Sequence, residues 1–261
     1  MHDAGTFPVI LIKPSHYDDD GYVIRWRRSV IPSNSLAAVY GLIMDCADRD
    51  VLDIPIVCDA IDETNTKVDV NAIIARIHSA GCGFVGLIGV QSNQFPRAMD
   101  LARRFRAADV PVMIGGFHVS GSLSMLPGMQ PELQQAIDLG ITLFAGEAEG
   151  RMDALLRDAR NGTLQPVYNY LNDLPNLDNE PVPFLPRDRI VRSMGMQTSF
   201  DAGRGCPFQC SFCTIINVQG RKSRRRGADD VERIIRANVA QGINDFFITD
   251  CLLYTSPSPR D

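Results

Sequence analysis

The sequence lacks the long apolar run that a membrane-spanning helix needs, and no basic segment followed by an apolar stretch opens the chain. These absences predict a cytoplasmic protein with no membrane span. An excess of positive charge is also missing, since the net charge is -5, which argues against general nucleic-acid binding. The 261 residues, 45% of them hydrophobic and 22% charged, have ordinary globular composition and predict one or two domains.

A fourth metal ligand is missing beside three closely spaced cysteines. Cys206, Cys210 and Cys213 form the pattern CxxxCxxC within one predicted loop. A closed structural zinc site wants four protein ligands, so three thiols predict an iron-sulfur cluster with one open position; a zinc knot or chance packing is the alternative. All the histidines lie at least ~85 residues upstream and supply no nearby fourth ligand: His2, His16, His78 and His118.

The segment before these cysteines alternates short apolar runs with amphipathic helices. The predicted strands are residues 9–12, 54–58, 84–90, 110–114 and 141–145. The predicted helices are residues 36–49, 70–80, 96–108, 131–139 and 149–160. This α/β order predicts a five-stranded parallel sheet covered on both faces, with any ligand beyond the carboxyl ends of the strands.

Polar and small residues follow three of the predicted strands. They are Gln91, Ser92 and Asn93, then Gly115, Gly116 and His118, then Gly146 and Glu147. Glycines at such ends allow a bulky ligand to approach the backbone, although the same residue types also serve merely to make turns. These residues are candidate cofactor contacts, and no catalytic residue can be assigned.

The remaining chain divides into three parts. Residues 161–200 are rich in proline and predict a connector between a first domain, residues 1–160, and a second region, residues 201–250. That second region predicts a helix over 228–241 and a strand over 245–250. Residues 251–261 have neither the apolar spacing of a helix nor the alternation of a strand. They resemble the translation of a sequencing adapter, so we expect a non-native tail.

The run from Arg204 to Thr214, with Phe212 just before the third cysteine, resembles the cluster loop of the radical S-adenosylmethionine superfamily. An α/β domain placed ahead of that loop resembles the cobalamin-binding subfamily. The resemblance implies a flavodoxin-like, doubly wound domain followed by the start of a (β/α) partial barrel, truncated in the radical domain. The DxHxxG pattern that supplies a lower histidine ligand to cobalt is absent. His118 is expected to touch the corrin without ligating the metal.

The same resemblance implies the cofactors and their ligands. Cys206, Cys210 and Cys213 would hold a [4Fe-4S] cluster, and S-adenosylmethionine would chelate the fourth iron, with Phe212 against its adenine. Cobalamin would pass a methyl group to a substrate radical. The expected activity is methylation or rearrangement of an unactivated carbon in a small molecule, with electrons from a flavodoxin or ferredoxin. The chain is expected to be inactive, because its barrel is incomplete.

Two other interpretations stay open. A methylthiotransferase shares the loop, but that family carries further cluster cysteines in its first domain, whereas Cys46, Cys58 and Cys82 lie singly in core-like segments. A non-catalytic module that binds cobalamin or a redox group is the other alternative. The basic run 221–226 could face an anionic substrate or the first domain, although a solvated loop is the simpler interpretation.

Overall fold

The computed structural model describes residues 5–250, and its main feature is a parallel sheet of six strands. The strands are β1 (Phe7–Lys13), β2 (Ile56–Asp62), β3 (Phe84–Leu87), β4 (Val112–Gly115), β5 (Thr142–Ala145) and β6 (Val167–Asn169). Their order across the sheet is β2-β1-β3-β4-β5-β6. The order changes direction at β1, so the carboxyl ends of β1 and β3 border a crevice where ligands bind in such sheets.

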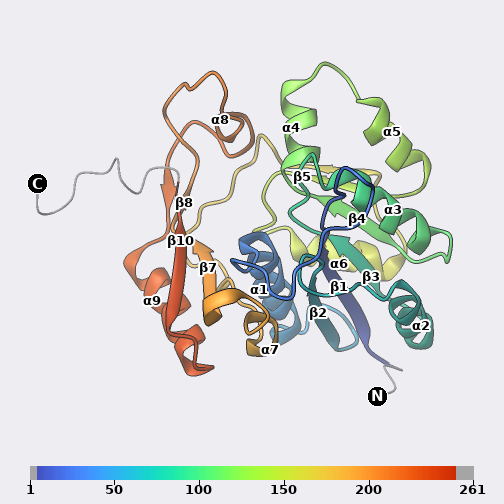
Figure 1. The fold of residues 1–261 in the computed structure, drawn as a ribbon, viewed down its shortest axis with the longest axis horizontal. Coiled ribbons are helices and arrows are strands. Elements are labelled where there is room, and N and C mark those ends of the chain that lie inside the picture. Colours follow the sequence, from blue (N-terminus) through green and yellow to red (C-terminus); the bar gives the residue numbers. More distant parts are fainter. Residues whose placement is uncertain (1–4, 251–261) are drawn as a thin grey trace, which may run out of the picture.

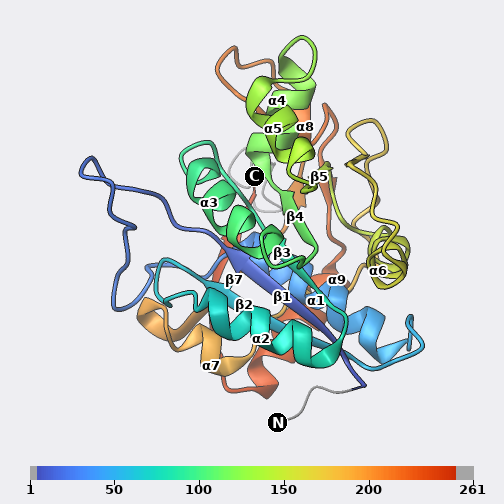
Figure 2. The same cartoon turned by 90° about the vertical axis from the view of Figure 1, so that its right-hand side faces the viewer.

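Helices cover both faces of this sheet (Figures 1 and 2). They are α1 (Asn34–Asp48), α2 (Val70–Ala80), α3 (Phe95–Arg106), α4 (Phe117–Met125), α5 (Pro131–Asp138) and α6 (Met152–Asn161). On one face, α2, α3 and α5 pack against Ile10 and Ile12 of β1. On the other face, α1 and α6 pack against Val9 and Leu11. The alternation along β1 therefore supplies both layers of the core.

Local sequence explains where the helices begin and end. The Asp69 side chain accepts a hydrogen bond from the Ala72 amide at the start of α2, and Gly81 ends that helix in the left-handed conformation. Ser33 caps α1 in the same way through the Leu36 amide. Among residues 5–250, no helix is long and apolar enough to cross a membrane.

A second region follows β6 and packs beside α1 (Figure 1). Its elements are α7 (Arg187–Ile190), a 3-10 turn (Met194–Met196), β7 (Gln197–Asp201), β8 (Gly203–Arg204), α8 (Ile215–Val218), β9 (Arg224–Arg225), α9 (Ala228–Ala240) and β10 (Asp245–Thr249). Strands β7 and β10 are parallel and joined through α9, while β8 and β9 are antiparallel. Ser199 on β7 donates a hydrogen bond of 2.8 Å to the Pro32 carbonyl, which ties β7 to the start of α1.

The five predicted strands and the five predicted helices that alternate with them are present, and α2 has the predicted bounds. The helix and strand predicted after the cysteines are also present, as α9 and β10. The structure also contains elements that were not predicted, among them the helix α4 and regular structure within residues 161–200, including the sixth strand β6, where proline suggested only a connector. Buried Leu177, Leu185 and Ile190 anchor that segment. The predicted non-native tail lies outside the described residues.

Candidate functional site between the sheet and the cysteine loop

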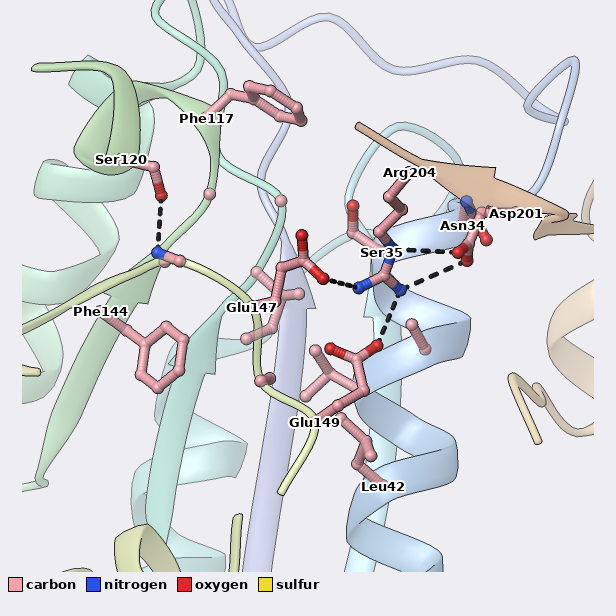
Figure 3. A pocket seen from close by; sticks show the side chains of 18 of the residues that line it. Asn34, Ser35, Leu42, Phe117, Ser120, Phe144, Glu147, Glu149, Asp201 and Arg204 are labelled. Atoms are coloured by element: carbon pink, nitrogen blue, oxygen red, sulfur yellow. Dashed lines mark hydrogen bonds and ion pairs between the residues drawn. The ribbon is translucent and has the colours of Figure 1, made fainter. Parts of the chain in front are cut away.

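A cavity of about 440 Å³ lies at the carboxyl ends of the sheet strands. Its walls come from α1, from the ends of β4 and β5, and from the second region. Figure 3 shows this arrangement, with Phe117 and Phe144 apart from the charged residues Glu147, Glu149 and Arg204, and with Leu42 of α1 next to Glu149. The volume is that of a small-molecule site, and most of its lining is apolar. Both regions of the chain therefore line the cavity.

The structure brings four of the predicted contacts to this cavity and leaves the others outside it. Gly115, Gly116, Gly146 and Glu147 line it. The other predicted cofactor contacts are not among its lining residues: Gln91, Ser92, Asn93, His118 and Phe212. Phe212 is 88% exposed on the cysteine loop. The binding roles of all nine residues stay predictions.

His118 is occupied by its neighbours. Its Nδ1 lies 3.2 Å from the Ser92 hydroxyl, its Nε2 lies 3.0 Å from a carboxylate oxygen of Glu132, and its ring stacks on Phe95. Burial lowers the pKa of this imidazole despite the nearby Glu132 carboxylate. Since His118 does not line the cavity and its ring nitrogens face Ser92 and Glu132, it is poorly placed to ligate a metal there. His78 is exposed on α2, and its Nε2 lies 2.8 Å from the Ala108 carbonyl oxygen.

The backbone itself requires glycine at position 116. Its φ angle is +146°, and a Cβ added there would lie 2.2 Å from the Val90 amide nitrogen. This close approach of β4's end to the turn after β3 explains the glycine without any ligand. The sequence alone could not separate this packing requirement from a cofactor contact.

The three cysteines follow β8. Cys206 is buried, Cys213 is half-buried and Cys210 is exposed, and all three thiols are free. The loop turns at Gly205, where φ is +79° and an added Cβ would lie 2.1 Å from the Lys222 carbonyl oxygen. In the part of the chain that the structure describes, no three His, Cys, Asp or Glu side chains already converge on one metal position. The donor set nevertheless fits a cluster, because three unpaired thiols share one short loop.

Arg204, immediately before Gly205 and Cys206, is surrounded by three carboxylates. Its Nε donates to Asp201 at 2.9 Å, its Nη1 to Glu147 at 2.9 Å, and its Nη2 lies 2.7 Å from Glu149. Burial alone would raise the pKa of the Glu149 carboxyl, but Arg204 outweighs that effect and the pKa lies below its usual value. Figure 3 shows these contacts at the edge of the cavity.

Two arginines of the basic run complete the network. Arg224 forms an ion pair with Glu147, and the buried Arg226 donates from Nε to the Asp201 carbonyl at 2.9 Å. The simpler interpretation of this run as a solvated loop is therefore wrong for Arg224 and Arg226; the alternative that it faces the first domain is confirmed for Arg224. Asp201 and Arg204 were not predicted as site residues. Asp201 ends β7 and Arg204 ends β8, a position that would have drawn attention to them, but neither strand had predicted bounds.

The chain therefore combines a parallel α/β sheet, a cavity at the carboxyl edge of that sheet, and a loop with three cysteines beside the cavity. No family model matches it. It is 28% identical over 152 residues to the bacteriochlorophyllide d C-8(2)-methyltransferase of Chlorobaculum tepidum, covering 54% of this chain and 31% of that protein. It is 24% identical over 172 residues to the hopanoid C-2 methylase of Rhodopseudomonas palustris, covering 64% of this chain and 30% of that protein.

A solved structure gives the same fold. The radical S-adenosylmethionine methyltransferase TsrM from Kitasatospora setae matches with a TM-score of 0.60 and 16% identity, over 94% of this chain and 47% of that one. The two curated relatives are named as a methyltransferase and a methylase, and the solved structure is a radical S-adenosylmethionine methyltransferase, so the resemblance drawn from the cysteine loop is confirmed. The chain spans about a third of the length of these two curated relatives and about half of TsrM.

Proposed function

We propose that this chain is the cofactor-binding part of a radical S-adenosylmethionine methyltransferase that acts on an unactivated carbon of a small molecule. The observation that carries the proposal is the cavity at the carboxyl edge of the parallel sheet, whose wall includes Arg204, two residues before Cys206. Methyl-donor chemistry and radical chemistry would then meet in one cleft. One TsrM structure has tryptophan and an S-adenosylmethionine analogue bound, and another has cobalamin and a [4Fe-4S] cluster bound.

Cys206, Cys210 and Cys213 would hold a [4Fe-4S] cluster, leaving one iron for S-adenosylmethionine. Such a cluster, when reduced, supplies the electron that cleaves the sulfonium of S-adenosylmethionine. The chain itself supplies the thiolates and a backbone turn at Gly205 that fixes the start of the loop. The exposed Phe212 is free to pack against a bound adenine ring, which supports its predicted role.

Cobalamin is the second proposed cofactor, and it would supply a methyl carrier beside the cluster. The order of strands β2-β1-β3-β4-β5 is that of flavodoxin-like sheets, which bind cofactors at their switch point. Apolar side chains such as Met113 and Phe144 would keep water from that side of the cavity. No described residue lining the cavity is a histidine, and His118 is engaged elsewhere, which supports binding without a lower imidazole ligand.

The domain division follows from the same proposal. Residues 1–160 would form the cobalamin-type domain, residues 161–200 the connector, and residues 201–250 the first part of a (β/α) barrel. The β7-α9-β10 unit, a parallel pair joined through a helix, supports a barrel of that kind. We place the protein in the cytoplasm, where a low-potential flavodoxin or ferredoxin would reduce the cluster.

A methylthiotransferase is the second candidate. A Methanocaldococcus jannaschii protein predicted to have that activity is 33% identical over 72 residues, which is 27% of this chain. The first-domain cysteines argue against it. Cys46 is buried in α1, and its thiol lies 3.4 Å from Asp153. Cys82 donates to the Thr6 carbonyl, also at 3.4 Å. Cys46 lies on α1, Cys58 on β2 and Cys82 after α2, so these three cysteines do not share one loop as the cysteines after β8 do.

Anaerobic reconstitution with ferrous iron and sulfide tests the proposal. We expect about four irons per chain, and loss of the cluster in Cys210→Ala but not in Cys82→Ala, because only the first removes a cluster thiolate. Iron and bound cobalamin are measured together. Normal iron content in Cys210→Ala would refute the cluster assignment. Tight zinc with no cobalamin in the unaltered chain would indicate a structural metal site instead.

A further inference from the structure

The cysteine loop is closed at its base by a short antiparallel ladder. Strands β8 and β9 pair with Arg204 opposite Arg224, and the loop between them carries the three cysteines and α8. A two-residue ladder has little stability of its own. The position of the loop therefore depends on what holds these two strands to the rest of the protein.

Both strands are held by one carboxylate of the first region. Glu147, in the turn after β5, accepts from Arg204 Nη1 at 2.9 Å through Oε2, and the same oxygen accepts from Arg224 Nη1 at 2.9 Å. Its Oε1 pairs with Arg224 Nη2. The side chain of Glu147 is 5% exposed, and those of Arg204 and Arg224 are 11% and 15% exposed. Water therefore competes little for these ion pairs.

The turn that carries Glu147 is itself fixed to the sheet region. The amide of Gly146 donates to the Ser120 hydroxyl of α4 at 3.1 Å, as Figure 3 shows. On the other side, Arg224 also donates to the carbonyls of Pro175 and Gln219, at 2.7 and 3.0 Å. Glu147 thus connects a rigid turn to a loop whose own ladder is short.

We propose that Glu147 is a positioning residue that clamps both ends of the cysteine loop, and so sets where the three thiols stand relative to the cavity. The identity of the group that the thiols hold rests on the proposed function, whereas the clamp itself does not. This role differs from the cofactor contact predicted for Glu147 from the sequence, because its two oxygens are already used by arginines.

Neighbouring acids provide matched comparisons. Glu149 has similar burial, at 4% exposed, but its ion pair is with Arg204 alone, so its loss leaves β9 held by Glu147. Glu232 forms an exposed pair with Arg236 within α9, away from the loop. Replacement by glutamine keeps the size of the side chain and removes its charge. A clamp at Glu147 predicts the order Glu147→Gln, then Glu149→Gln, then Glu232→Gln in effect on the loop.

Limited trypsin digestion of the iron-free 261-residue chain tests the clamp directly. Arg221 and Lys222 are exposed trypsin sites within the loop, and Arg25 and Arg27 are exposed sites in the amino-terminal loop that serve as an internal reference. We expect cleavage after Arg221 and Lys222 to be on the order of tenfold faster in Glu147→Gln, with the reference sites unchanged. Arg224→Gln should reproduce this, and the double variant should add little, as for residues that act together.

The reconstituted protein gives a second measurement. Glu147→Gln should still take up iron, because its cysteines are intact, but it should lose iron to a chelator about tenfold faster and show an altered electron paramagnetic resonance signal. Wild-type cleavage rates and an unaltered signal in Glu147→Gln would overturn the proposal, as would equally faster cleavage at the reference sites. Absence of iron in the unaltered chain would refute the proposed function and leave the digestion test of the clamp valid.

Discussion

The sheet region, which contains β1 to β6, and the cysteine region, which is the second region that follows β6, are stabilised in different ways. In the sheet region, side chains on both faces of the central strands are fully buried: Ile10, Leu11, Ile12, Leu87 and Ile114 are at most 1% exposed. In the cysteine region, Phe247 and Ile248 on β10 are 42% and 41% exposed. Apolar burial therefore maintains the first region. In the second region it is partial, because Phe200 on β7 is fully buried whereas β10 presents apolar surface.

The second region compensates through charge and through its contact with α1. Arg204, Arg224 and Arg226 oppose Glu147, Glu149 and Asp201, so the buried charges balance in number. Removing one member of a buried pair costs roughly 3–5 kcal/mol, because the partner charge stays uncompensated. A charge network of this kind gives a defined position to a loop that has no core of its own.

The largest expected effect is the loss of unfolding free energy when a side chain in the core of the sheet region is removed. Phe105→Ala on α3 removes a fully buried ring, and should lower the free energy of unfolding by about 3–5 kcal/mol in urea denaturation. The same change at Phe212, which is 88% exposed, should shift it by no more than ~0.5 kcal/mol in iron-free protein. Equal effects at the two positions would remove the distinction between the regions.

Thiol reactivity sharpens the comparison further. Burial, helped by the Asp153 contact, raises the pKa of Cys46 to about 12. The thiolate is the reactive form, so iodoacetamide at pH 8 should label Cys46 about 10³-fold more slowly than a cysteine of ordinary pKa. The exposed Cys210 of iron-free protein should be labelled before Cys46, as followed by mass spectrometry. Labelling of Cys46 should still rise above pH 10; comparable rates at the two cysteines would contradict the burial of Cys46.

The two regions also differ in how well sequence patterns predict their helices and strands. Val70, Ile73 and Ile77 repeat at helical spacing, so the bounds of α2 follow from periodicity and from Asp69 and Gly81. Helix α4 begins directly at the turn after β4 and contains small polar residues, so no apolar period identified it. The sequence pattern did not predict β6 and α7, because both lie in proline-rich stretches and are buried by residues that are distant in the chain.

The site was predictable only in part. Strand ends directed attention to Gly115, Gly146 and Glu147, and all three line the cavity. The partners of Glu147 are 57 and 77 residues away along the chain, at Arg204 and Arg224. No local pattern encodes that pairing, since it depends on how the cysteine loop folds back onto the turn after β5. Long-range ion pairs of this type emerge only from the assembled fold.

The smallest expected effect concerns the apolar surface of β10. Ile248→Thr keeps a β-branched side chain on the strand and, at 41% exposure, should change the free energy of unfolding by no more than ~0.5 kcal/mol. The same substitution at the fully buried Ile114 of β4 places an unpaired hydroxyl in the core and should cost roughly 2–4 kcal/mol. Urea denaturation measures both. A large loss at Ile248 would mean that this strand is covered in solution, for example by a second copy of the chain, and that the exposed side of β10 also depends on apolar burial.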